Sequence, residues 1–370
     1  MDIKTARSRG VELATKLPWQ EIADSPTIRY YTDWSKFEGF KGLEKPQRVP
    51  TSASKCEVVV LNGALANHGV CEGVEIGVGG EVFRHLQINS KILALHASVL
   101  HEAVYVRIRG RVEPLIIKLA AFERGFHIAS HVVLDVEESA EGSVIIYVES
   151  GEGVMHTAVV EGEVKGSVEY VLISRGSGPQ YVHSSLAVAK SVAARPLALG
   201  GVMNAVREEY IIGERASAEV IGLELGLGES RIDHVVSVIN DAPEGRGYAR
   251  LYAVAADKSF VSQRAVGRIT KRGVRSESSV EGVVYIAGEG AVANTQPVIL
   301  VETGDVMGAR HSAADAALDE DKEFFLRSRG VRREYLSQLL MLSLADQYLS
   351  SLTESSRGFV EAVLRSLAIF

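Results

Sequence analysis

The sequence predicts a mainly β protein, a right-handed parallel β-helix (a β-solenoid) flanked by small helical domains at both ends. Between residues 55 and 304, runs of about 4–8 residues rich in Val, Ile and Tyr are each closed by Gly, Asn or Asp. The same stretch holds 29 of the 35 glycines, which is typical of closely spaced turns. A helical period is absent there, except around residues 184–206, and this excludes an alternating strand–helix architecture.

Residues 1–54 predict a small N-terminal domain. Both tryptophans lie in it, and residues 6–18 form a short helical pattern that ends at Pro18. Residues 26–40 are rich in aromatic side chains, and we expect them to fold back on another part of the chain. The loop at residues 45–54 is expected to end this domain.

The β region, residues 55–304, is expected to form one continuous solenoid. Stacked antiparallel sandwiches are the alternative, but their hairpins usually carry Asn-Gly or Asp-Gly turns. The chain has one Asn-Gly, at Asn62–Gly63, and no Asp-Gly. A stretch of 250 residues without a linker is long for one sandwich, whereas solenoid coils need only their neighbours. The strict six-residue period of left-handed acyltransferase helices is absent. The predicted strands are residues 56–63, 73–80, 91–100, 103–110, 114–122, 142–150, 167–176, 218–228, 233–241, 248–257 and 282–290.

Residues 305–370 predict a C-terminal helical domain. The segment 318–330 has Asp319 as N-cap, acidic residues in its first turn, two arginines at its end and Gly330 after it. Two further helices with wide apolar faces are predicted within residues 331–352 and 358–370. This domain either caps the end of the solenoid or docks a partner, and the pattern alone leaves both functions open.

Composition and motifs exclude several function classes. The net charge is −7 and no basic stripe is evident, so nucleic acid is not an expected partner. No apolar run reaches the ~18 residues that cross a bilayer, and no secretion signal is evident, so we expect a cytoplasmic protein without a membrane partner. The sequence contains neither a phosphate-binding loop nor a nucleophile elbow. Its two cysteines, Cys56 and Cys71, are expected to be buried free thiols in that compartment.

The histidines and acidic residues give no convincing catalytic site. On a strand, His127 and His131 would lie about 13 Å apart on one side, at ~3.3 Å per residue, too far to share a metal ion. His96 and His101 would lie on opposite sides of another strand. We expect these four to line one face of a sheet. Acidic residues such as Glu161 mostly neighbour glycine, which indicates solvated turns rather than paired catalytic carboxylates. These features favour a scaffold or interaction protein over an enzyme.

Residues 297–331 resemble the signature of the SufB/SufD family of iron–sulfur cluster assembly proteins. The matching positions, in the family's order, are Asp305–Val306, His311, Asp319–Glu320, Phe325, Leu326 and the Arg-Ser-Arg-Gly block at residues 327–330. Residues 248–290 resemble the family's last β-helix coils, and residues 26–34 resemble its N-terminal aromatic segment. The similarity therefore spans most of the chain.

The resemblance implies a right-handed β-helix between helical ends and a non-enzymatic subunit. Family members bind the ABC-type ATPase SufC through their C-terminal helical domain and pair with each other through the late β-helix strands. ATP-driven rearrangement of SufC then opens that interface for cluster assembly. The expected partners are a SufC-type ATPase and a SufB-type paralogue or a second copy of this chain. The residues expected to bind a partner are Phe324, Phe325, Arg327, Arg329, Tyr335, Leu336, Leu339 and Leu340.

Departures from the family pattern favour a SufD-like subunit. SufB-like scaffolds carry a ligand cysteine in the last coil, near Gly282–Val283, and a glutamate after the histidine. This chain has neither, since Ser312 follows His311, and the cysteine that SufD often has two residues before the histidine is Ala309. With no thiol after Cys71, we expect no stably bound cluster. A transient cluster at the partner interface would have His311 as its one ligand from this chain.

Two alternatives to the SufD-like subunit stay open. A homodimeric SufB-like scaffold would retain a cluster after anaerobic reconstitution, whereas a SufD-like chain would not. A carbohydrate-active β-helix enzyme, the remote alternative, would bind or turn over a glycan and would not bind SufC. For His311, a packing role at the seam between the β-helix and the helical domain stays open beside the ligand role.

Overall fold

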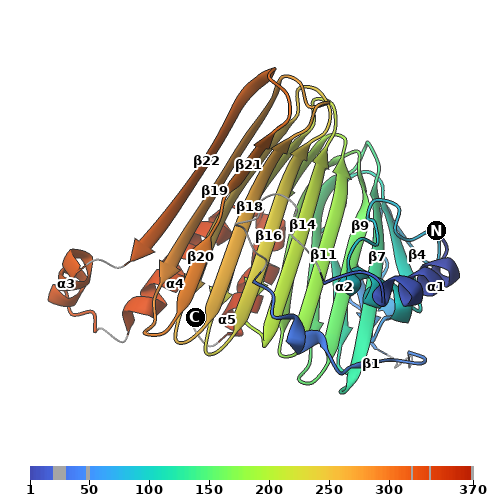
Figure 1. The fold of residues 1–370 in the computed structure, drawn as a ribbon, viewed down its shortest axis with the longest axis horizontal. Coiled ribbons are helices and arrows are strands. Elements are labelled where there is room, and N and C mark those ends of the chain that lie inside the picture. Colours follow the sequence, from blue (N-terminus) through green and yellow to red (C-terminus); the bar gives the residue numbers. More distant parts are fainter. Residues whose placement is uncertain (20–30, 47–50, 318–319, 333–334, 368–370) are drawn as a thin grey trace.

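A computed structural model describes residues 1–19, 31–46, 51–317, 320–332 and 335–367. Within these ranges, two sheets of 11 strands each run side by side along the molecule (Figure 1). The chain passes from one sheet to the other after nearly every strand, so that strands two apart in sequence, such as β14 and β16, pair in parallel. The predicted fold class, a parallel β-solenoid with small terminal helices, is confirmed.

The first sheet, sheet A, has β20 at one edge and β4 at the other. Its strands are β1 (Lys41–Gly42), β4 (Val74–Val78), β5 (Ala103–Ile108), β7 (Phe126–Val136), β9 (Met155–Val164), β11 (Pro179–Val188), β14 (Met203–Ile212), β16 (Arg231–Asn240), β18 (Phe260–Ile269), β20 (Val292–Thr295) and β21 (Val298–Val301). Sheet B has β22 at one edge and the β2–β3 hairpin at the other. Its strands are β2 (Glu57–Leu61), β3 (Ala64–His68), β6 (Leu115–Ala121), β8 (Glu141–Ser150), β10 (Ser167–Gly176), β12 (Ser191–Ala194), β13 (Leu197–Leu199), β15 (Ser217–Gly226), β17 (Arg246–Ala255), β19 (Ser276–Ile286) and β22 (Val306–Ala317).

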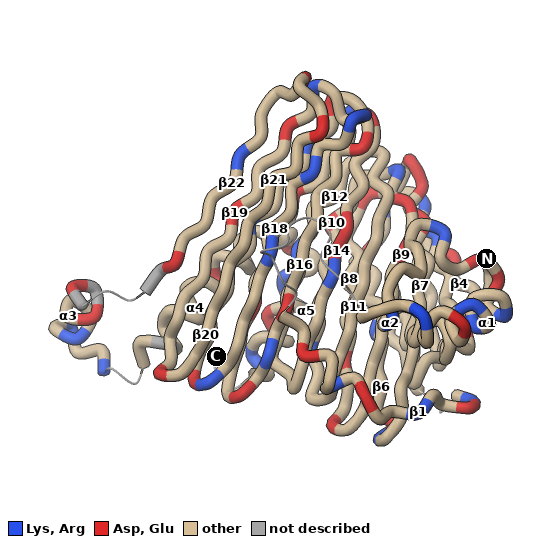
Figure 2. Tube along the Cα trace, in the orientation of Figure 1, with Lys and Arg blue, Asp and Glu red and all other residues tan. Residues whose placement is uncertain are grey.

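The main hydrophobic core lies between the two sheets. Every second residue of a strand points inward, as the two-residue period of a strand requires. On β9, for example, Ala158, Val160 and Val164 belong to this core, whereas Met155 and Val159 pack outside it against helices. Charged residues gather at the turns and strand ends, and the strands between them carry few (Figure 2).

The helices of the described residues are α1 (Ile3–Ala14), the 3-10 turn Trp34–Phe37, α2 (Lys91–Val99), α3 (Glu320–Ser328), α4 (Leu336–Ser350) and α5 (Glu354–Arg365). All of them except α3 cover part of the outer face of a sheet. Helices α1 and α2 pack on sheet A together with Phe37, and α4 and α5 pack on sheet B. No helix formed by the described residues is both long and apolar enough to cross a membrane.

A buried carboxylate on β10 fixes α5 to sheet B. Glu169 accepts hydrogen bonds from the backbone N–H of Thr353 at 2.7 Å and from its hydroxyl at 2.6 Å, and also from the hydroxyl of Ser356. These donors belong to the first turn of α5 and its N-cap, where a negative charge also offsets the helix dipole. At the end of α4, the Tyr348 hydroxyl donates to the backbone oxygen of Arg195 at 2.7 Å.

One predicted strand is a helix, and the solenoid ends later than predicted. Residues 91–100 form helix α2, not a strand, because their apolar residues follow neither period and a short apolar run does not distinguish the two structures. Residues 184–206, the exception to the absence of a helical period, lie in strands and turns of the solenoid. Strand β22 extends the solenoid to Ala317, beyond the expected boundary at residue 304. The helices predicted after it are present as α3, α4 and α5, while Asp319, the predicted N-cap, lies outside the described residues.

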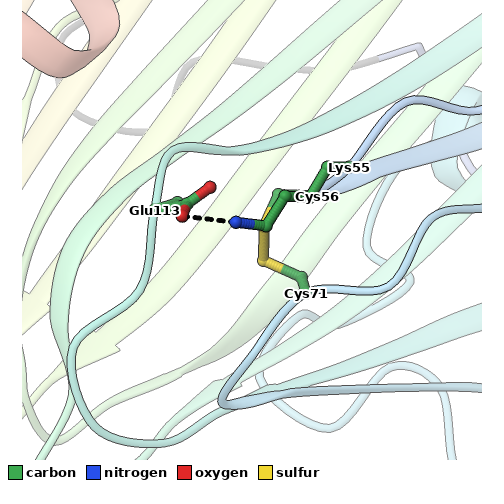
Figure 3. The surroundings of a disulfide bond; sticks show 4 residues. All are labelled: Lys55, Cys56, Cys71 and Glu113. Atoms are coloured by element: carbon green, nitrogen blue, oxygen red, sulfur yellow. Dashed lines mark hydrogen bonds and ion pairs between the residues drawn. A yellow bond between two sulfur atoms is a disulfide. The ribbon is translucent and has the colours of Figure 1, made fainter.

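The prediction of two free cysteines is also wrong. Cys56 and Cys71 form a disulfide across the base of the β2–β3 hairpin, beside the ion pair of Lys55 and Glu113 (Figure 3). The prediction of burial is confirmed, since both cysteines are less than 10% exposed. This prediction was wrong because it rested on the expected cellular compartment alone. The redox state of a compartment sets only a statistical preference between free thiols and disulfides.

Removing this disulfide is expected to lower the free energy of unfolding by about 3 kcal/mol, the chain-entropy value for a loop of about 15 residues. The double variant C56S/C71S, compared with wild type by urea denaturation, measures it. The variant K55A is the control, because the Lys55–Glu113 pair is more than 60% exposed on both sides and is worth less than about 1 kcal/mol. A C56S/C71S variant as stable as K55A would contradict the prediction.

Candidate functional site

The two ends of the solenoid differ. At the first end, β3 pairs antiparallel with β2, and β4 pairs antiparallel with β5. At the second end, which we call the bare end, no described strand pairs with the outer side of β22, β20 or β21. A long unpaired edge leaves a row of backbone donors and acceptors free, and proteins usually cover or blunt such an edge. The apolar residues more than 40% exposed near this bare end are Ile286, Val292, Val301 and Met307.

His311 lies on β22, the outermost strand of the bare end. Its exposed imidazole contacts the backbone oxygen of Pro297 through Nδ1 at 3.2 Å. A carbonyl oxygen only accepts, so Nδ1 carries the hydrogen, and in the neutral imidazole Nε2 then presents a lone pair. Metal-binding histidines are commonly oriented by such a contact. His311 is therefore a strand residue at an open edge, not a residue of a connector.

No group of three His, Cys, Asp or Glu side chains that could hold a metal ion occurs among the residues described. His311 therefore offers one ligand at most from this chain. Sequence reasoning missed Asp315, which lies four residues further along β22 on the same side as His311. The spacing of four residues places both side chains on one side of a strand, but residues 306–317 were not predicted to form a strand, so the sequence reasoning had no signal to use.

Helix α3 follows β22 and lies apart from both sheets (Figure 1). Phe324 is 74% exposed and Phe325 is 53% exposed. The guanidinium of Arg329 lies 3.5 Å from the centroid of the Phe325 ring, a cation–π contact. Helix α3 ends at Ser328, and Gly330, the glycine predicted to follow the helix, has a φ of +89°. Two exposed phenylalanines on one short helix indicate a contact surface.

The residues predicted to bind a partner divide into two groups. Phe324, Phe325, Arg327, Arg329, Tyr335 and Leu339 are exposed. In contrast, Leu336 is 7% exposed and Leu340 packs against the core between α4 and sheet B. Leu336 is therefore buried and Leu340 partly buried, so both expose less of their side chains to a partner than the first group does.

A chain of hydrogen bonds joins α2 to the outer face of sheet A. His131 contacts Glu161 at 3.0 Å and His96 at 3.1 Å. Thr157 then contacts His96 at 2.9 Å and His127 at 2.8 Å. The prediction that His127 and His131 share one face of a strand is confirmed, but His96 lies on a helix, and Glu161 is fully buried rather than part of a solvated turn. His101, just beyond α2, lies outside this chain of hydrogen bonds and donates through Nε2 to the backbone oxygen of Leu43 at 2.6 Å.

A second polar cluster lies between the sheets. His234 contacts Glu208 through Nε2 at 2.9 Å and Glu224 through Nδ1 at 2.5 Å, and the Tyr210 hydroxyl donates to Glu208. Burial alone would lower the pKa of His234, but the two carboxylates outweigh it and raise the pKa to about 9. The imidazolium is therefore a buried cation that contacts two carboxylates, and these contacts join strands β14, β15 and β16.

Comparisons with known proteins match the chain to one family. The SufBD core domain of SUF-system FeS cluster assembly matches residues 120–343. An iron–sulfur cluster assembly SufBD family protein from Pyrococcus horikoshii is 23% identical over 296 residues, 76% of this chain and 62% of that protein. The iron–sulfur cluster assembly protein SufD of Bacillus subtilis is 22% identical over 131 residues, 35% of this chain and 30% of that protein. A SufBD family protein of Mycobacterium tuberculosis is 30% identical over 81 residues, 22% of this chain and 17% of that protein.

The chain thus spans 62% of the length of the Pyrococcus relative and less of the other two. The core-domain match covers 224 of the 370 residues, more than half of the chain. It includes the coils from β7 onward, the bare end with His311, and α3. The protein belongs to the SufBD family of the SUF iron–sulfur cluster assembly system.

Proposed function

We propose that this chain is a non-catalytic, SufD-like subunit of an iron–sulfur cluster assembly complex. It pairs through the bare end of the solenoid with a SufB-type paralogue or a second copy, and it binds a SufC-type ABC ATPase through α3 and the start of α4. The observation that carries the proposal is the position of two exposed surfaces inside the family match: the unpaired edge at β22 and the two phenylalanines of α3.

The cluster is cargo in this proposal. His311 faces the partner from β22 and contributes one nitrogen, while thiolates come from the other subunit. The distribution of sulfur supports this division of roles, because both cysteines of this chain are joined in a disulfide at the opposite end of the solenoid. A SufB-like scaffold would need thiolate at the bare end, which makes it the less favoured alternative.

The double variant F324A/F325A is expected to weaken binding to a SufC-type ATPase at least tenfold, since exposed aromatic anchors usually carry most of the binding energy of an interface. Isothermal titration calorimetry of the full chain with the purified ATPase measures the effect. The control is F122A, because Phe122 is also about half exposed but lies at the end of β6 in the body of the solenoid. Equal affinity of wild type and F324A/F325A, or no binding by wild type, would reject the docking role.

A further inference from the structure

A cavity of about 450 Å³ lies at the turns that precede β15, β17 and β19 of sheet B. Of the described residues, three arginines line it, Arg215, Arg246 and Arg275, together with two glutamates, Glu244 and Glu277. These five side chains give the cavity a charge of +1, although the net charge of the chain is −7. The volume falls within the range of roughly 300–1,000 Å³ that is typical of small-molecule sites.

Three of the charged residues occupy equivalent positions in successive turns. The backbone N–H groups of Arg215, Glu244 and Arg275 each donate to a carbonyl in the turn of the next coil, at 3.0, 3.0 and 2.7 Å. Their φ angles are +55°, +60° and +58°, in the left-handed region that residues other than glycine rarely adopt. Glycine would fit each position at lower cost, so the backbone does not account for charged side chains there. Such a position with an unfavourable residue is a reason to look for a function of the side chain.

Arg246, at the start of β17, has no direct partner for its guanidinium. Its neighbour in the strand register is Glu277, whose carboxylate instead accepts from the Tyr248 hydroxyl at 2.8 Å and from Arg310 at 3.0 Å. Among the described residues, none accepts a hydrogen bond from the Arg246 side chain, and no carboxylate oxygen lies within 4.0 Å of its nitrogens. A guanidinium carries five N–H donors in a rigid fork that matches the oxygens of a phosphate.

Glu244 lies between the two other arginines and competes with an anion for them. It accepts from Nε of Arg215 at 3.0 Å and lies 3.9 Å from Nε of Arg275. Both arginine side chains are more than 60% exposed and Glu244 is 39% exposed, so these ion pairs contribute little to stability. A ligand with two negative charges can therefore take the place of Glu244 at low cost, and it then contacts three guanidiniums.

Met307, near the start of β22, gives the cavity an apolar wall. Its side chain is 72% exposed, and the flexible thioether adapts to irregular apolar surfaces. A free phosphate ion would contact the arginines and leave this wall unused. The combination of guanidiniums and an apolar side chain therefore favours a phosphate group that is attached to an organic molecule.

We propose that this cavity binds the phosphate group of a small phosphate ester. Arg246 holds the phosphate in a bidentate contact, Arg215 and Arg275 contact it from the sides, and the organic part lies against Met307. The site goes beyond the proposed function and does not depend on it. It lies at the start of β22, whereas α3, the proposed ATPase-binding helix, follows the end of that strand (Figure 1). Failure of one proposal is therefore distinguishable from failure of the other.

Isothermal titration calorimetry of the full chain tests the ligand class with three probes. AMP carries a phosphate ester, adenosine lacks the phosphate, and inorganic phosphate lacks the organic part. AMP is expected to bind saturably and at least tenfold more tightly than either of the other two. Adenosine that binds as tightly as AMP would overturn phosphate recognition, and inorganic phosphate that does so would overturn the choice of an ester. The absence of saturable AMP binding at millimolar concentration would overturn the site.

Three variants test the assigned residues, each first shown by urea denaturation to be folded. R246A is expected to weaken AMP binding at least tenfold. E244Q is expected to tighten it about threefold, because the competing carboxylate is lost. The matched control is R250A, which removes the same charge from the same strand, since Arg250 already pairs with Glu281 at 2.7 Å. It is expected to change the affinity less than twofold.

Three results would overturn the assignment. An R246A variant that binds AMP as tightly as wild type would exclude Arg246 as the main contact. An R250A variant as weak as R246A would show that only net charge matters. An E244Q variant that binds no more tightly than wild type would exclude competition for Arg215 and Arg275, a role that a merely structural glutamate would not have.

Discussion

The free energy of unfolding is expected to fall by several kcal/mol as the pH drops from 6.5 to 4. Burial lowers the pKa of His96 well below its ordinary value, that of His127 to about 3 and that of His156 to about 4. Neighbouring histidines add to the effect for His96 and His127. The folded state therefore keeps these three imidazoles neutral across a range in which the unfolded chain protonates them.

The sign follows from proton linkage. Below an unfolded pKa of about 6.5, the unfolded state binds three protons that the folded state does not, so acid favours unfolding by up to about 4 kcal/mol per pH unit. This contribution is fully present above pH 6.5 and is lost progressively as the pH falls toward the folded pKa values. Glu161, whose pKa is lowered because hydrogen bonds from His131 outweigh its burial, acts in the same direction near the lower end of the range.

Urea denaturation at pH 7, 6 and 5 measures this slope. The variant H127Q is expected to reduce the slope by about a third, because one of three linked protons is removed while an amide can still contact Thr157. The control H68Q changes an exposed histidine of β3 and is expected to leave the slope unchanged. A wild-type stability that stays flat between pH 7 and 5 would contradict the buried neutral cluster.

The fold was predictable because a solenoid is built from local units. Each coil needs only a short apolar strand and a turn, and the runs from residue 103 onward contain both signals. The single Asn-Gly at residues 62–63 also marks a real hairpin, since Asn62 and Gly63 both have positive φ. Helix α2 was not predictable in this way, because its residues are buried on several sides and its conformation depends on packing against α1 and sheet A.

The candidate site was predictable only in part. The family resemblance located His311 and the exposed phenylalanines of α3, because these positions belong to a contiguous motif. It did not separate exposed from buried leucines in α4, since this depends on which face packs on sheet B. The buried clusters were missed for a different reason. Glu208, Glu224 and His234 meet across sequence separations of 10 and 26 residues, and no fixed period relates them, because turn lengths differ from coil to coil.

Replacing Glu208 by alanine is expected to lower the free energy of unfolding by about 3–5 kcal/mol, the usual cost of removing one partner from a buried charge pair. Both Glu208 and His234 are essentially inaccessible to solvent. Without Glu208, the imidazole keeps Glu224 as its remaining acid, and the Tyr210 hydroxyl loses its acceptor inside the core.

The matched control is E209A, one residue along the same strand. Glu209 points to the outer face, where it approaches His183 at 3.8 Å and is 38% exposed, so its loss is expected to cost less than about 1 kcal/mol. The two variants make the same substitution at adjacent positions of β14, so the change in strand propensity is the same in both. The difference between their free energies of unfolding therefore reports the interactions of the carboxylate that lies between the sheets. Equal destabilisation by E208A and E209A in guanidinium denaturation would show that the inner acid carries no special interaction with His234. A large difference that shrinks above pH 9 would instead identify the imidazolium as its partner, since the stabilisation from a raised imidazole pKa is present below about 6.5 and is lost as the pH rises through about 9.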